Sequence, residues 1–514
     1  MVDTRLTIAV RFYNACLHEM IQRSRLIRTT PAFKVAKQLP SGTARSQAFR
    51  DLDTVHGFTD SAAMTFASSM RVVWLREHIL AQEAQVLGRR AFTAVRRWHL
   101  GLGGRPRFKS FRAGLRSLSC KDSHGSLWPS HRDGVVLGLF WGRRQHLLAF
   151  AQPPVGGGRR GREQRAEWAQ VQELIVSGKV LSVAIVKSTV RGRSTYRAHL
   201  TCDGPRPQRH PIGAGRVSMD LGPSVNAVVT ADVQPDGQLQ VASARLVRMA
   251  PGITDTAKIL RRLQRKLDRQ HRAGSPACFD RRGRHVHGRC LWQVRSAAAR
   301  RTLASISELG RTRAEYRKSS HGRQVNNMLA AGSIIHAEKL NYVAWQKNWG
   351  RSVHDRAPGM LVELIRGKAE SAGGGLLEYS TYTTRLSQAC VCGALVKKPL
   401  VQRVHRCPCG VVAQRDLFSA FLGLFVHRQP DPQVPGALVD VLDLEQAKMA
   451  WSSAHEVEWM PGSSTSTAGR KQRGQVRPSR RSVARIKARR SPARPDRAAR
   501  HEVARAPVTA QVAA

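Results

Sequence analysis

Residues 384–425 read TRLSQACVCGALVKKPLVQRVHRCPCGVVAQRDLFSAFLGLF, and the interpretation of the rest of the chain starts from this stretch. It holds four of the nine cysteines in two C-x-C pairs, each pair followed by a glycine: Cys390, Cys392, Cys407 and Cys409. Glycine lets the backbone turn so that its amides face the sulfurs. Two cysteine pairs on two turns are a typical donor set for tetrahedral zinc. The spacing is shorter than the commoner C-x-x-C, so unligated thiols or disulfides are the alternative; we expect zinc.

Three acidic residues stand at the ends of predicted elements. Asp220 ends the first of two strands in RVSMDLGPSVNAVVTAD, Glu338 ends a strand in GSIIHAEKL, and Asp416 opens an apolar helix. Three carboxylates brought together raise one another's pKa values unless cations lie between them. Oxygen ligands suit Mg²⁺ or Mn²⁺, the ions of two-metal phosphodiester cleavage. The alternative is three unrelated surface acids, with Asp416 only a helix cap.

Four segments resemble the split RuvC nuclease domain of TnpB proteins, which are transposon-encoded RNA-guided DNA endonucleases similar to compact type V CRISPR effectors. These segments are SMDLGPSVNAVV, IIHAEKLNYVAWQKNWGRSV, RAPGMLVELI and the cysteine block through RDLFSAFL. The close resemblance covers about residues 213–428 and a looser one covers 1–212. Two positions depart from the family pattern: Gln414 replaces the first Asp of Asp-Arg-Asp, and Phe418 stands where many members have Asn.

The resemblance implies an RNase H fold in which Asp220, Glu338 and Asp416 are catalytic and bind Mg²⁺ or Mn²⁺. It also implies that the four cysteines are zinc ligands of a structural ribbon, since four thiolates leave no open coordination position. Guide RNA and target double-stranded DNA are the implied partners.

Composition points to a polyanionic partner. The 514 residues include 85 Lys+Arg against 35 Asp+Glu, a net charge of +50. Such self-repulsion favours nucleic acid as counter-charge, with an anionic membrane surface as the competing partner. There is no 18-residue apolar run and no signal peptide, so we expect neither a membrane-spanning nor a secreted protein. The other five cysteines are scattered, as in a reducing cytoplasm, and we expect a prokaryotic, nucleoid-associated protein.

We expect an α+β multidomain chain. The predicted parts are a helical recognition segment (about 5–100), a β-barrel wedge domain (about 105–212), a RuvC domain (213–386) with a helical insertion (about 253–330), a zinc ribbon (387–411), a final RuvC helix (412–428) and a basic, largely disordered tail (429–514). Three local details are also predicted. One long helix runs from Thr59-Asp60 towards Leu100, residues 153–165 form a basic loop, and the helix over 291–330 is interrupted near Gly310.

Predicted nucleic-acid contacts lie in two places. GRPRFKS (104–110) carries Arg107 and Lys109 around Phe108, a combination suited to a phosphate beside a stacked base, although a plain loop is the alternative. Arg415, next to Asp416, is the third predicted contact.

The leading functional hypothesis is an RNA-guided DNA endonuclease in which Asp220 bridges two metals while Glu338 and Asp416 each hold one. Three alternatives stay open: an RNA-guided binding protein with little or no cleavage, a DNA-joining transposase, and an unguided structure-specific resolvase. The sequence does not predict the oligomeric state.

Overall fold

The computed structural model separates the chain into two units, Met1–Trp459 and Met460–Ala514, and the account below concerns the first. No helix in the described part of the chain is both long and apolar enough to cross a membrane. The described residues are 1–111, 114–121, 127–130, 136–141, 144–149, 158–204, 210–286, 295–399, 402–431 and 436–460.

The N-terminal segment is helical, as predicted. Its elements are α1 (Val2–Thr29), α2 (Pro31–Gln38), α3 (Thr43–Val55), α4 (Asp60–Trp74) and α5 (Ala81–His99). Apolar side chains of α1, among them Leu6, Val10 and Leu17, are buried against α5. Gly88 of α5 permits close approach to α4, because a Cβ there would lie 2.6 Å from the Ala63 carbonyl oxygen.

The predicted single helix from Thr59 towards Leu100 is wrong. Thr59 does cap α4, accepting a hydrogen bond from the Ala62 amide at 3.2 Å. However, α4 ends at Trp74, and α5 begins seven residues later, at Ala81. The Glu83 carboxylate accepts from the Leu80 amide at 3.1 Å and so satisfies one of the free donors at the start of α5.

Two three-stranded antiparallel sheets follow. One has the order β1-β5-β6 and the other β2-β3-β4. The strands are β1 (Ser117–Ser119), β2 (Leu127–Ser130), β3 (Val136–Trp141), β4 (Arg144–Ala149), β5 (Val180–Val190) and β6 (Arg193–Cys202), with α6 (Arg159–Val176) before β5. Both sheets contribute to one apolar cluster that includes Leu127, Leu139, Val183 and Ile185. Barrel closure is not seen among the described strands and stays a prediction, whereas the basic loop predicted over 153–165 is helical from Arg159 onward.

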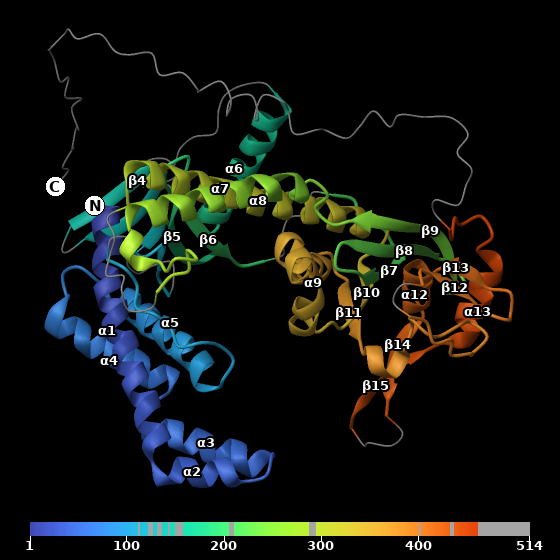
Figure 1. The fold of residues 1–514 in the computed structure, drawn as a ribbon, viewed down its shortest axis with the longest axis horizontal. Helices are drawn as coiled ribbons and strands as arrows, with labels where there is room; N and C mark the ends of the chain where they lie inside the picture. The colour runs from blue at the N-terminus through green and yellow to red at the C-terminus, as the bar shows by residue number, and fades with distance from the viewer. Residues whose placement is uncertain are drawn as a thin grey trace. The chain divides into compact units, whose positions relative to one another are not determined.

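A mixed five-stranded sheet in the order β11-β10-β7-β8-β9 is the centre of the C-terminal half (Figure 1). Strands β7 (Arg216–Leu221), β8 (Val225–Val233) and β9 (Leu239–Arg248) form an antiparallel meander, and β10 (Ile334–Glu338) and β11 (Gly375–Tyr379) add in parallel. Gly222 and Pro223 make the tight turn between β7 and β8, where a Cβ on Gly222 would lie 2.4 Å from the Val225 carbonyl oxygen. The predicted α+β multidomain class is thus confirmed as a mixed α/β chain.

Long helices lie beside this sheet. Figure 1 shows α7 (Ile253–Gly274) and α8 (Ala297–Leu329) running side by side. The short helix η1 (Pro276–Cys278) comes between them in the chain. Helices α9 (Tyr342–Arg356) and α10 (Pro358–Ser371) connect β10 to β11, and α11 (Thr381–Thr384) follows β11. The α8 helix continues through Gly310, so the predicted interruption is wrong. No atom lies within 4 Å of where a Gly310 Cβ would be.

Arg313 ties three of these helices together. Its side chain is 5% exposed and donates to the Asp355 carboxylate of α9 at 2.6 Å. It also donates to the Ile253 carbonyl and the Thr256 hydroxyl of α7. A buried guanidinium with several partners holds α7, α8 and α9 in one arrangement, because breaking the set leaves an unpaired buried charge.

Ordered structure continues beyond the residue where we predicted a disordered tail. After β12 (Val404–Arg406), β13 (Val412–Gln414) and α12 (Arg415–Gly423) come β14 (Val426–Pro430), β15 (Leu438–Leu442) and α13 (Leu444–Ser453). Trp451 and Trp459 pack against each other at a tilt, with centroids 4.8 Å apart, and both contact Phe421 of α12 edge-on. The tail boundary at 429 is therefore corrected to a position after Trp459, and the disorder predicted for 461–514 lies outside the described residues.

Candidate active site and cysteine cluster

The parallel pairing of β7 with β10 brings two of the predicted acids to one edge of the sheet. Met219 pairs with Ala337, and one residue further on stand Asp220 and Glu338. Since both strands run in the same direction, the two carboxylates lie level with each other on one face. That face is covered by α12, whose first turn carries Asp416.

The charges of Glu338 and Asp416 both act on Asp220. Burial raises the pKa of Asp220 well above its ordinary value, and the charges of Glu338 and Asp416 raise it further. The Ser419 hydroxyl and the Arg415 guanidinium act in the opposite direction. Burial also raises the pKa of Glu338 to about 7. Ionising this group of carboxylates is therefore costly unless a cation is bound between them.

Asp416 differs from the other two because cationic and amide side chains already contact it. Arg415 Nη2 lies 3.1 Å and Arg403 Nη1 3.3 Å from its carboxylate oxygens, and the Gln414 amide donates at 3.2 Å. Arg403 comes from the segment between the two cysteine pairs. The cysteine-rich region and the third carboxylate are therefore in direct contact.

Both departures from the family pattern have structural roles. The Gln414 side-chain oxygen caps α12 by accepting from the Leu417 amide at 2.7 Å, so the capping role considered as the alternative for Asp416 belongs to Gln414. Phe418 is 1% exposed and stacks on His405 with centroids 4.4 Å apart. Phe418 thus belongs to the core.

Three buried polar residues accompany the carboxylates, and sequence reasoning missed them. Ser218 and His336 precede Asp220 and Glu338 by two residues, which places them on the same sheet face. His336 Nδ1 lies 2.8 Å from the Gly423 carbonyl oxygen, and burial lowers the pKa of this histidine to about 4, so it is neutral at pH 7. The fully buried Tyr379 has its pKa raised by burial and by the charges of Glu338 and Asp220. The signal available in the sequence for Ser218 and His336 was a polar residue two positions before each acid in an otherwise apolar strand.

The four predicted zinc ligands form a tight cluster. Their sulfur atoms all lie within 4.8 Å of one another, and within the described ranges this is the one such group of three or more His, Cys, Asp or Glu side chains. The Cys390–Cys409 and Cys392–Cys407 sulfur distances are both 3.6 Å. A zinc tetrahedron with Zn–S bonds of about 2.3 Å has edges of about 3.8 Å. The cluster can therefore hold a zinc ion.

Backbone geometry at the two turns supports this donor set. Gly393 and Gly410 have φ values of +85° and +92°, and their amides donate to the carbonyls of Cys390 and Cys407 at 3.0 Å. The pKa of Cys392 is lowered to about 7, chiefly by the backbone amide of Ala394. A thiol of this kind ionises easily, as metal binding requires.

The predicted nucleic-acid contacts fall on two separate elements. The loop carrying Arg107 and Lys109 is joined to α1, because the Asn14 side chain accepts from the Lys109 amide at 2.8 Å and donates to its carbonyl at 2.9 Å. Phe108 between them is 51% exposed. Arg415, in contrast, is bonded to Asp416 and to the Gln402 carbonyl.

No protein-family model and no curated protein matches the chain. Among solved structures, the chain is similar to one in the cryo-EM structure of the Cas12f1–sgRNA–target DNA complex. The TM-score is 0.46 and the identity 14%, and the match covers 81% of each chain.

Proposed function

We propose that the protein is an RNA-guided DNA endonuclease that cleaves its target at Asp220, Glu338 and Asp416. The observation that carries this proposal is the convergence of three carboxylates at one sheet edge, with the pKa of Asp220 and Glu338 raised. Such an arrangement destabilises the metal-free protein and favours divalent cations, for which carboxylate oxygens are suitable ligands. An unrelated set of surface acids would be dispersed and solvated.

The residues divide the work as follows. Asp220, Glu338 and Asp416 would together hold Mg²⁺ or Mn²⁺ ions, with Asp220 as the shared ligand and Glu338 and Asp416 as one further ligand each. Bound there, the ions would supply an activated water and stabilise the departing oxygen of the phosphodiester. Arg415 and Arg403 orient Asp416, and the side chain of Arg403, 64% exposed, is available to a DNA phosphate.

The cysteine cluster takes a structural role in this proposal. A zinc ion held by four thiolates has no open position for substrate. Its function would be to fix the segment that carries Arg403, and through Arg403 the Asp416 carboxylate. Zinc would thereby influence cleavage without touching the reacting atoms.

The sequence resemblance to TnpB supports the guide RNA and the transposon association, and the net charge of +50 supports nucleic acid as the partner. In this reading, base pairing selects the target double-stranded DNA while basic surfaces of the protein hold the heteroduplex. One observation favours a second candidate, RNA-guided binding with little cleavage. Asp416 is already bonded to two arginines and a glutamine, which compete with metal for its oxygens.

The test begins with the RNA that co-purifies with the protein. A single abundant species with a constant scaffold and a variable end would identify a guide. Plasmids matching that variable end are then incubated with the complex in Mg²⁺, and cleavage and binding are measured side by side.

The Asp220→Ala variant should bind the target and leave it uncut, whereas Asp232→Ala, which removes an exposed acid on β8, should cut normally. Cleavage by Asp220→Ala would refute the assignment of the site. Binding without cleavage by the unmutated complex, with both Mg²⁺ and Mn²⁺, would favour the second candidate.

A further inference from the structure

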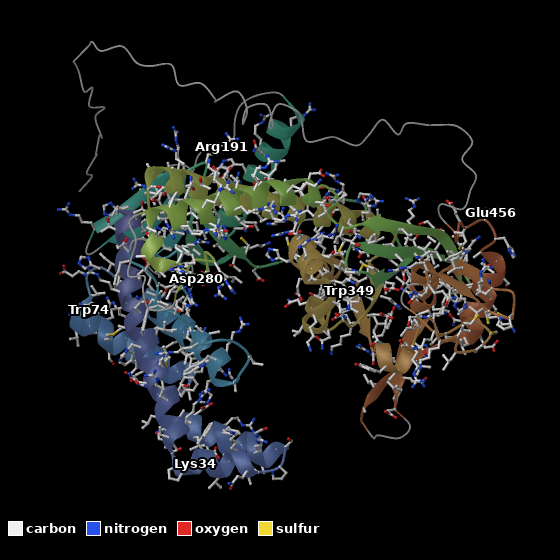
Figure 2. All side chains as sticks on the ribbon, viewed as in Figure 1. Lys34, Trp74, Arg191, Asp280, Trp349 and Glu456 are labelled. Atoms are coloured by element: carbon white, nitrogen blue, oxygen red, sulfur yellow. The ribbon has the colours of Figure 1, made fainter. Side chains whose placement is uncertain are left out.

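A basic groove with an exposed tryptophan lies between α7 and α9. One pocket of about 440 Å³ is lined by Lys258 and Arg261 of α7 and by Trp349, Arg351 and Arg356 of α9. Figure 2 labels Trp349 on α9. A second pocket of about 380 Å³ shares Lys258 and Arg261 and is otherwise lined by Arg262, Arg265 and Arg269. The pockets adjoin at these two shared residues, and together we call them the basic groove.

The positive charge of this groove is not neutralised by protein acids. None of its five α7 cations forms an ion pair with any residue that the structure describes. The acid that lines the first pocket, Asp355, is bonded to Arg313 at 2.6 Å. At a rise of about 1.5 Å per residue, Lys258 and Arg269 stand roughly 16 Å apart along the helix. A row of this length spans several phosphates of an extended strand.

Trp349 adds a surface for a base. Its side chain is 36% exposed, and the backbone of α9 departs from helical geometry at this residue, with φ −125° and ψ 27°. Trp345 packs edge-on against it at a centroid distance of 6.0 Å and an interplanar angle of 75°. An indole supported from one side and open to a basic pocket is the arrangement by which proteins hold unpaired bases. A duplex, with its bases stacked on each other, does not offer a free base face.

The groove is attached to the strand ends that carry the carboxylates. The Ser352 hydroxyl of α9 donates to the Pro223 carbonyl at 2.6 Å, and Pro223 follows Asp220 by three residues. Asn341, the cap of α9, follows Glu338 by three residues. A strand held in the groove therefore lies on the element that connects directly to the proposed cleavage site.

We propose that this groove binds a single-stranded segment of DNA, with one base stacked on Trp349 and successive phosphates on the cations of α7. The assignment to the DNA strand being cleaved rests on the proposed function. Binding itself requires no guide and no cleavage, so it is measured separately.

The test uses the full-length protein, freed of co-purified RNA, and fluorescein-labelled dT12, with binding followed by anisotropy at fixed salt without divalent ions. Trp349→Ala should weaken binding about five- to hundredfold, the range for losing one stacked base. Trp349→Phe should retain most of the affinity. Trp74→Ala, which removes an indole 49% exposed on α4, should bind as the unmutated protein does. Arg265→Gln should reduce the slope of log affinity against log salt by about 0.7, as expected for one lost phosphate contact on a single strand.

Equal binding of dT12 by the unmutated protein and Trp349→Ala would overturn the proposal, as would equal losses in Trp349→Ala and Trp74→Ala. Melting temperatures of all variants show whether a loss of dT12 affinity comes from misfolding. If Trp349→Ala is misfolded, the dT12 affinity of Trp349→Phe tests the proposal in its place. Tighter, Trp349-dependent binding of U12 would assign the groove to RNA and overturn the DNA assignment. If plasmid cleavage fails while Trp349-dependent dT12 binding persists, the proposed function is wrong but the groove still binds single-stranded DNA.

Discussion

Replacing Glu338 by glutamine should stabilise the protein in alkaline buffer without Mg²⁺. The folded protein raises the pKa of Glu338 from its ordinary 4.5 to about 7. The folded state therefore holds this proton more tightly than the unfolded state, and stability is lost as the pH rises from 4.5 through 7. At about 1.4 kcal/mol per pKa unit, the loss reaches roughly 3 kcal/mol at pH 8 and stays under about 1 kcal/mol at pH 5. Glutamine keeps the shape of the side chain and carries no charge.

The assay is thermal unfolding at pH 5 and pH 8 in buffer depleted of Mg²⁺ but not treated with chelators that remove zinc. For a domain of about 150–250 residues, roughly 3 kcal/mol corresponds to a rise in melting temperature of about 6–12 °C at pH 8. Glu363→Gln, at an exposed position of α10, is the matched control and should change little at either pH. Added Mg²⁺ should remove the difference in melting temperature between Glu338→Gln and the unmutated protein at pH 8. A ligand at about 100 times its Kd stabilises the unmutated protein by about 2.7 kcal/mol.

Two results would refute this reasoning. If Glu338→Gln and the unmutated protein melt alike at pH 8, the carboxylate is not held in a packed acidic group. If Glu338→Gln is destabilised equally at both pH values, its effect comes from lost hydrogen bonding and not from charge.

Three further predictions follow from the site and the boundaries of the fold. Cys407→Ser should lower zinc content, about one ion per chain in the unmutated protein, and also the melting temperature; elemental analysis finding no zinc in active protein would contradict this. Removing residues 461–514 should leave cooperative unfolding intact, whereas removal from 430 should yield insoluble protein because the tryptophans packed on α12 are lost; equal solubility of both would disprove the corrected boundary. Guided cleavage should fall as far in Asp220→Ala and in Asp416→Ala as in the double variant, because the acids act as a unit, and additive rate losses would argue against this.

The central strands were predictable from sequence because turn residues and side-chain alternation agreed. The Gly222-Pro223 turn predicted the hairpin whose first strand carries Asp220, and that hairpin is present, with its first strand ending one residue later at Leu221. The convergence of the acids could be expected only by resemblance, because pairing of β7 with β10 joins residues more than a hundred positions apart. The buried partners Ser218 and His336 depend on that same pairing.

The wrong predictions share a cause: local composition was given too much weight. Gly310 did not interrupt α8, since a glycine in a helix costs only about 1 kcal/mol and packing against α7 offsets it. The basic character of residues after 470 was extended back to 429. Trp451 and Trp459, which pack on the helix carrying Asp416, were the apolar signal that this extension overlooked.

The backbone amide of Gln414 donates to the Trp459 carbonyl at 2.8 Å. Gln414, the N-cap of the helix that carries Asp416, is therefore held by a residue that lies more than forty positions later in the chain. A chain emerging from the ribosome holds Asp220 and Glu338 long before this closing contact can form. Because this contact needs Trp459, we expect the acidic site to be completed only after most of the chain has been synthesised. We therefore expect a nascent chain to bind nucleic acid on its basic helices before the proposed cleavage site is complete.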